Sequence, residues 1–143
     1  MIFPLTSADS LLVANMDTPA VLIPAHLAPM ALHFYEHDLF PSQYKHAAFV
    51  ACRAGALSSD PGYKVMALFA EPDGSNARVA DFLTGFRLES DEDTGRSLFS
   101  GFFFSRSSNA WGKPVGLTTD EAGHLYLTSD ETTQAIFRIE ASP

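Results

Sequence analysis

The sequence has little of several residue types, and each shortage excludes a class of protein. Cys52 is the single cysteine, so an intrachain disulfide is excluded. The nine Lys and Arg residues are spread along the chain and outnumbered by 17 Asp and Glu residues, which gives a formal net charge of −8. This balance argues against a nucleic-acid backbone or an acidic membrane surface as partner. No apolar run approaches the roughly 20 residues that span a bilayer.

The remaining composition is sufficient for one domain with a dense β core. The chain has 143 residues, of which 46% are hydrophobic and 12 are Phe. Met1 is not followed by a charged segment and a long apolar core, so no signal peptide is expected and the compartment stays unknown. The serines lack a Gly-x-Ser-x-Gly motif, so nothing favours a serine hydrolase.

The stretch from Trp111 to Ile139 has the clearest secondary-structure pattern. Short runs rich in Val, Leu, Ile, Tyr, Phe and Thr alternate there with Gly- and Asp-containing turns, which is typical of antiparallel strands. Gly123 can adopt the left-handed backbone that a tight turn often needs. The three strands predicted here cover residues 115–118, 124–128 and 135–139.

The rest of the chain contains further strand candidates and two irregular segments. Residues 1–19 are predicted to be an N-terminal lead or an edge strand. Residues 87–110 are polar and acidic, then aromatic, then Ser-rich, and are predicted to be an inserted loop. The strands predicted between these segments cover residues 20–23, 30–35, 47–52, 63–70 and 78–86.

The order of the strands repeats. A proline-led strand at Pro29, a buried strand and an amphipathic strand are followed later by the same series from Pro114. Residues 20–143 therefore predict an all-β fold of antiparallel, four-stranded, blade-like sheets, which is a partial β-propeller of about two blades. Two blades cannot close a ring, and they leave apolar faces and open strand edges uncovered. We expect the chain to be part of something larger, to self-associate, or to join another chain through its open sheet edges.

Several local motifs allow a chemical interpretation beside a structural one. Residues 33–37 (HFYEH) fit the H-x-x-E-H pattern of inverted zinc proteases, but the aromatic pair and the nearby prolines favour strand and turn over the required helix. Cys52 is interpreted as a buried thiol, and the acidic residues 89–93 as a solvated loop rather than a Ca²⁺ site. Residues 102–104, all Phe, are interpreted as core or interface, and as the best partner surface if exposed.

Four separated motifs resemble one known family. They are PAHLAPMALHFY, then AAFVACRAG with the following DPGYKV, then DFLTGF, then WGKPVGLTTDEAGHLYLTSDETTQAIFRI. These motifs resemble the C-terminal part of the soluble glucose/sorbosone dehydrogenases, six-bladed β-propeller quinoproteins that use pyrroloquinoline quinone (PQQ) to oxidise sugars. The resemblance covers residues 18–139. It implies PQQ as cofactor, with Ca²⁺ in full-length members, and a sugar or aldehyde as substrate.

The resemblance also implies three cofactor-binding residues. His26 falls on the family's Pro-Ala-His position, Arg53 follows the AAFVA strand, and Lys113 replaces the arginine of the family's Arg-Pro-Val-Gly strand opening. Together they are predicted either to form a cationic rim near the quinone carboxylates, although lysine loses the two-pronged geometry of arginine, or to be ordinary solvated surface residues. The family's His-Gly-Ser-Trp-Asn-Arg run is replaced here by residues 53–58. The family's catalytic histidine and calcium ligands have no counterpart, so no catalytic residue or metal ligand is assigned.

Two functions follow from these observations. The resemblance implies the C-terminal portion of a PQQ-dependent sugar or aldehyde dehydrogenase that is inactive or incomplete alone. The alternative is a non-catalytic β-sheet binding or interaction module that associates with another chain. Full-length members of the resembled family are usually periplasmic or secreted. A fluorescence titration with PQQ and Ca²⁺, together with a dye-coupled assay with glucose and sorbosone, tests the first function. Light scattering tests the second, because a stable monodisperse monomer would argue against it.

Overall fold

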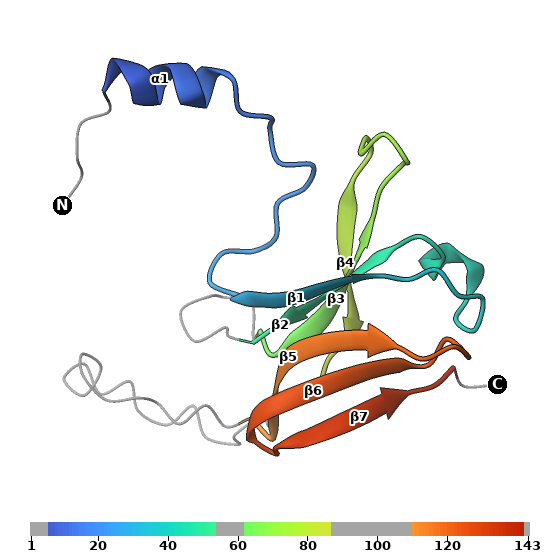
Figure 1. Ribbon diagram of the computed structural model, residues 1–143. Coiled ribbons are helices and arrows are strands. Elements are labelled where there is room, and N and C mark those ends of the chain that lie inside the picture. Colours follow the sequence, from blue (N-terminus) through green and yellow to red (C-terminus); the bar gives the residue numbers. More distant parts are fainter. Residues whose placement is uncertain (1–5, 54–61, 87–109, 142–143) are drawn as a thin grey trace, which may run out of the picture.

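The structure is a computed structural model that describes residues 6–53, 62–86 and 110–141. It contains two antiparallel β-sheets and one α-helix that stands apart from them (Figure 1). The four-stranded sheet has the order β1-β2-β3-β4 and the three-stranded sheet the order β5-β6-β7, so both are meanders. The elements are α1 Ser7–Ala14, β1 Pro29–Phe34, the short 3-10 helix η1 Ser42–Tyr44, β2 Ala48–Cys52, β3 Lys64–Phe69, β4 Arg78–Leu83, β5 Gly112–Thr119, β6 Leu125–Thr132 and β7 Ala135–Ile139.

The all-β prediction is confirmed, with differences in detail. Seven of the eight predicted strands each overlap one strand of the structure. The strand predicted over residues 20–23 is wrong, and Pro19 and Pro24 on either side of it restrict backbone pairing there. Both sheets were expected to have four strands, whereas the described part of the second sheet has three. The predicted loop over residues 87–110 lies outside the described residues, apart from Ala110.

Helix α1 occupies part of the segment predicted to be a lead or an edge strand. Its start is set by a capping box, in which the Thr6 hydroxyl accepts from the Asp9 backbone N–H at 3.2 Å and the Asp9 carboxylate accepts from the Thr6 N–H at 2.8 Å. Hydrogen bonds from Thr6 lower the pKa of Asp9. None of the residues of α1 is buried. In the part of the chain that the structure describes, no helix is long and apolar enough to cross a membrane.

The main core lies between the two sheets. Because side chains alternate between the faces of a strand, every second residue of each strand points toward the other sheet. Phe49, Ala51 and Val65 of the four-stranded sheet share one buried cluster with Leu125 and Leu127 of β6. Strand β5 lies against β1 and β2 and so forms the contact between the layers. The two sheets are therefore held face to face by apolar packing.

Tyr35, directly after β1, joins this core to the turn between β5 and β6. Its side chain is fully buried, and its hydroxyl donates to the Gly123 carbonyl oxygen at 2.8 Å. The same hydroxyl accepts a hydrogen bond from the Phe40 backbone N–H at 3.3 Å, and the two rings stack with centroids 4.9 Å apart. Burial raises the pKa of the Tyr35 hydroxyl, so the group remains a donor across the neutral range. One side chain thus links the two sheets and orders the loop after β1.

We expect the Tyr35→Phe variant to lose about 1–3 kcal/mol of unfolding free energy, because the Gly123 carbonyl and the Phe40 N–H would be left buried without a partner. The measurement is urea denaturation followed by the fluorescence of Trp111. Tyr44→Phe is the matched control, since the Tyr44 hydroxyl makes no hydrogen bond with any described residue while its ring also packs in the core. Equal losses in the two variants would contradict this role of the hydroxyl.

Gly123 is required by both its backbone and its surroundings. Its φ is +89°, and a Cβ atom on it would lie 2.7 Å from Cβ and 3.1 Å from Cγ of His37. Gly74 has a similar φ of +81° but open space around it. The two glycines therefore separate backbone strain from steric overlap.

We expect Gly74→Ala to cost about 1–2 kcal/mol through left-handed strain alone, and Gly123→Ala to cost a further 1–3 kcal/mol or so from overpacking against His37. Thermal and urea unfolding of both variants measure the difference. If Gly123→Ala is no more destabilising than Gly74→Ala, the turn is looser than the structure shows.

Candidate functional site

Two of the three predicted cofactor residues meet at one end of the sheets. Arg53, directly after β2, donates from Nε to the Asp130 carboxylate at 3.0 and 3.1 Å and from a terminal nitrogen to Glu131 Oε2 at 3.0 Å. Lys113 Nζ, from β5, lies 2.7 Å from the same Glu131 oxygen. We call these four residues the ion-paired joint, because they connect the four-stranded sheet to the three-stranded one. His26 is exposed, and within the described residues no hydrogen bond or ion pair links it to this joint.

The charges of the ion-paired joint balance. Two cations face two carboxylates, and the Lys113 side chain is only 11% exposed. The hydrogen bond from Lys113 lowers the pKa of Glu131, and the hydrogen bond to Asp130 raises the pKa of Arg53. Each cation of the joint is therefore matched by a carboxylate of the same chain.

This balance bears on the predicted cofactor. An anionic cofactor such as PQQ needs free cationic donors, but the carboxylates of the joint already occupy Arg53 and Lys113. The arrangement seen here therefore does not fit the predicted cationic rim, and no chemical step is derived from it. No group of three or more His, Cys, Asp or Glu residues in the described parts of the chain is placed to hold a metal ion such as Ca²⁺.

We expect Glu131→Gln to lower the urea midpoint at neutral pH, because the buried Lys113 ammonium would lose its carboxylate. Since folding lowers the pKa of Glu131 below its ordinary value of 4.5, its contribution is fully present above that value and is lost as the pH falls through the folded pKa. The difference between the variant and the parent should therefore shrink on acidification. Glu121→Gln, at an exposed position without an ion pair among the described residues, is the control. A midpoint difference that does not change with pH would refute this explanation.

A second polar contact lies at the other end of the sheets. His33 Nε2 on β1 lies 3.1 Å from the Thr119 hydroxyl of β5, and His37 Nε2 lies 3.3 Å from the same oxygen. Burial, and to a smaller extent His37, lowers the pKa of His33, which favours neutral imidazole there. These are the two histidines of the H-x-x-E-H pattern, and they stand on a strand and the loop after it rather than on a helix. The two histidines thus contribute to the contact between the sheets. The residues between them and the nearby prolines had predicted strand and turn instead of a helix.

The β5–β6 turn carries its own polar network beside these histidines. The Asp120 carboxylate lies 2.9 Å from His124 Nδ1, accepts from the His124 backbone N–H at 2.9 Å, and accepts from the Tyr126 hydroxyl at 3.1 Å. Burial on its own would raise the pKa of Asp120, but these hydrogen bonds prevail and lower it to about 2. The network stiffens the turn whose Gly123 carbonyl receives the Tyr35 hydroxyl.

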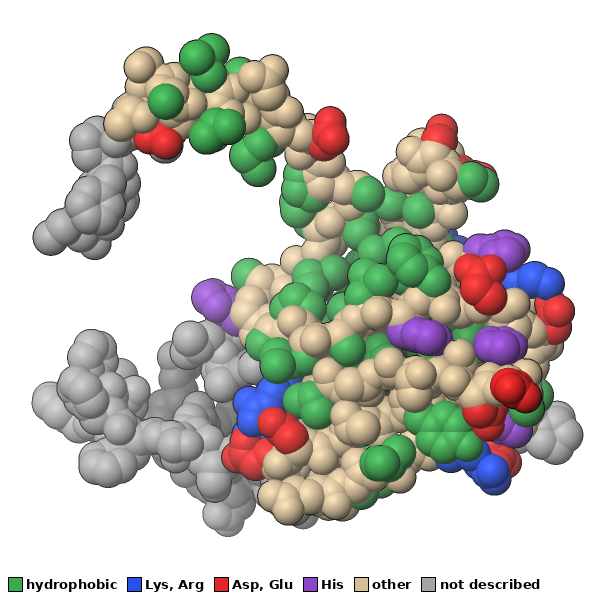
Figure 2. All heavy atoms as spheres, viewed as in Figure 1, with side chains coloured by type: hydrophobic (Ala, Val, Ile, Leu, Met, Phe, Trp, Pro, Cys, Tyr) green, Lys and Arg blue, Asp and Glu red, His purple; other side chains and the backbone are tan. Residues whose placement is uncertain are grey.

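The third feature is apolar and faces outward. The face of the four-stranded sheet that points away from the three-stranded one is called the outer face here. Its edge strand β1 exposes Met30, Leu32 and Phe34 by 54%, 55% and 61%, and Figure 2 shows hydrophobic side chains gathered over this region. The remaining apolar members are Val50, Cys52, Met66, Leu68 and Val79 from β2, β3 and β4.

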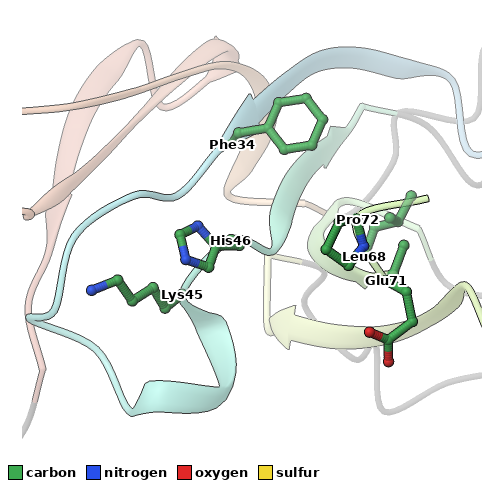
Figure 3. Close-up of a pocket in the computed structure, with 7 residues that line it drawn as sticks. Phe34, Lys45, His46, Leu68, Glu71 and Pro72 are labelled. Carbon is green, nitrogen blue, oxygen red and sulfur yellow. The ribbon is translucent and has the colours of Figure 1, made fainter. Parts of the chain in front are cut away.

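The outer face ends in a groove of about 590 Å³. Phe34, Leu68 and Pro72 supply its apolar walls, and Lys45, His46 and Glu71 lie at its rim (Figure 3). An exposed apolar stripe beside an apolar groove is the usual form of a protein-binding surface. The outer face is therefore the surface best suited to a partner.

The sequence analysis missed several of these residues. Asp130 and Glu131 were interpreted only as residues between the last two predicted strands, because no local pattern connects them to Arg53 or Lys113. The outer face was missed because residues 30–35 were predicted only as a strand. Apolar residues occupy both sets of alternate positions in it, and these two sets point to opposite faces of the sheet. The three Phe of residues 102–104, expected to be the best partner surface, lie outside the described residues.

The fold and contacts define a class of all-β protein, in which two meander sheets share a core and an outer apolar face remains exposed. The chain belongs to the family described as TrAA12-like, which it matches over residues 5–142. An uncharacterized protein of Borreliella burgdorferi is 31% identical over 110 residues, which make up 76% of this chain and 24% of that protein. The chain thus spans about a quarter of that relative's length. No solved structure matches the chain.

These matches correct the family assigned from the sequence motifs. The family is TrAA12-like, so the assignment to the soluble glucose/sorbosone dehydrogenases is wrong. Neither match names PQQ, a quinoprotein or a sugar dehydrogenase, and the dehydrogenase function implied by the resemblance is withdrawn. The motifs behind it consist mainly of strand and turn residues. Such residues report sheet architecture, which families of different function share.

Proposed function

We propose that this chain is a β-sheet interaction unit that associates with another protein surface through the outer face of its four-stranded sheet. The observation that carries the proposal is the exposure of the three large apolar side chains of β1 on the outer face. They lie beside β2, whose five residues, Ala48–Cys52, are all buried, on the outer side by Leu27 of the same chain. An exposed apolar stripe of this kind is typical of a surface that binds a partner.

The same observations support a finer architecture. We propose that the two sheets are neighbouring, blade-like sheets of a propeller-type assembly. Both are meanders whose first strand carries a proline, Pro29 or Pro114, near its start, and the two sheets share one core. Because the chain corresponds to a small part of its relative from Borreliella burgdorferi, the activity of such a larger assembly is a separate question.

We expect the chain to associate as its concentration rises through the micromolar range, and Leu32→Asp to abolish this association, because the new carboxylate would have to be desolvated at the interface. Sedimentation velocity combined with light scattering measures the mass at each concentration. Ile136→Asp is the matched control, since Ile136 is 72% exposed on the other sheet.

The two variants also show how the proposal fails. A chain that stays monomeric at every concentration would overturn it. So would association that survives Leu32→Asp but is lost in Ile136→Asp, because the interface would then lie on the three-stranded sheet.

A further inference from the structure

We infer that helix α1 of a second copy of the chain covers the outer face, in an arm-exchanged dimer in which each α1 lies along β1 of the other copy. The inference rests on the proposed function and names its partner. It is carried by the presence of two exposed apolar surfaces in one chain, one on α1 and a longer one on β1.

The first surface is α1 itself. Leu11, Leu12 and Val13 are 56–68% exposed, Met16 beyond the helix end is 70% exposed, and none of the helix residues is buried. Figure 1 shows the helix standing away from both sheets, and Figure 2 shows its hydrophobic side chains open to solvent. A helix of eight residues is shorter than the roughly 12–15 residues at which isolated helices become even marginally stable in water. The capping box supports its start but does not replace a packing partner.

The second surface has the dimensions that α1 requires. Strand β1 has six residues and is about 20 Å long, while the eight residues of α1 span about 12 Å. The groove at the Phe34 end of the stripe offers apolar walls for one or two further side chains. A helix laid on an apolar sheet face is one of the standard layer packings.

The chain between these surfaces already follows the outer face. Leu27 is 1% exposed and forms a buried cluster with Val50 and Met66, against which Ile23 packs. The segment that connects α1 to β1 therefore lies on its own sheet from Leu27 back to Ile23. From there α1 is carried away from the body (Figure 1), so the apolar stripe of β1 stays open in its own chain. In a two-fold pair the same contact forms twice, which doubles the area that one short helix buries.

Charge makes the association depend on salt in a defined direction. Each chain carries a net charge of −8, so two copies repel each other while their apolar surfaces attract. Screening weakens the repulsion but not the apolar contact. The dimer should therefore tighten as salt is added, whereas a contact made by ion pairs would loosen.

Cross-linking of variants with one added cysteine tests the arrangement directly. Leu12→Cys and Leu32→Cys are prepared separately, mixed and treated with a short bismaleimide, while the native Cys52 is buried and out of reach. We expect cross-linked dimers in the mixture and few in either variant alone, because only the mixture places a cysteine on α1 of one copy against a cysteine on β1 of the other.

Sedimentation of two helix variants provides the quantitative test. We expect Leu12→Asp to weaken the dimer at least about tenfold, as loss of one buried leucine implies. Ser7→Asp adds the same charge in the first turn, where a carboxylate is favourable, and should leave the dimer unchanged.

Two outcomes would overturn the inference. If a double Leu12→Cys, Leu32→Cys chain cross-links within a monomer while the mixture does not cross-link, α1 covers its own sheet. If Leu32→Asp abolishes association but Leu12→Asp does not, the outer face is an interface and α1 is not its occupant. The second outcome leaves the proposed function standing, so the two failures are distinguishable.

Discussion

The fold depends on a hydroxyl group that is buried between two sheets. Tyr35 continues the inward side of β1 past the end of the strand, and its backbone pairs with His46 and Ala47 at 2.7 and 2.8 Å. Its hydroxyl then reaches the Gly123 carbonyl of the other sheet. A hydrogen bond in this apolar setting is costly to break, because neither partner can turn to water. The position of one sheet relative to the other is thus set by a directional contact as well as by apolar packing.

The polar contacts at the two ends of the sheets complete this arrangement. At one end Arg53 and Lys113 share the Glu131 carboxylate, and at the other His33 and His37 share the Thr119 hydroxyl. At the first end, the Glu131 carboxylate joins Arg53 of the four-stranded sheet to Lys113 of its own sheet. At the other end, the Thr119 hydroxyl of β5 contacts one histidine on β1 and one in the loop after it. The sheets are therefore held at both ends and in the middle. This makes the outer face of the four-stranded sheet a rigid platform, and a rigid surface loses less entropy when a partner binds.

The sequence was sufficient to predict the strands, because each has the alternation or the continuous apolar run that its burial requires. It did not predict α1, where Leu11, Leu12 and Val13 fit a strand as well as a helix and the capping pair Thr6 and Asp9 was the overlooked signal. It identified Arg53 and Lys113 as a pair of cations but not their neutralisation by Glu131, which lies 78 positions from Arg53 and 18 from Lys113 in sequence. Long-range pairing of this kind follows from the packing of the sheets and leaves no local pattern.

The exposed outer face and the exposed helix α1 have one common physical explanation. An exposed apolar edge strand invites unselective pairing, and proteins usually protect such strands with charge or with a cover. The acidic net charge of this chain supplies a general repulsion, so contacts that bury little apolar surface are disfavoured between copies. The proposed contact of Leu11, Leu12 and Val13 along β1 buries more apolar surface than such contacts do, and its gain grows with that area. Because α1 is too short to be stable alone, its folding and the covering of the sheet become one coupled step, which restricts the face to a partner that brings the complementary helix.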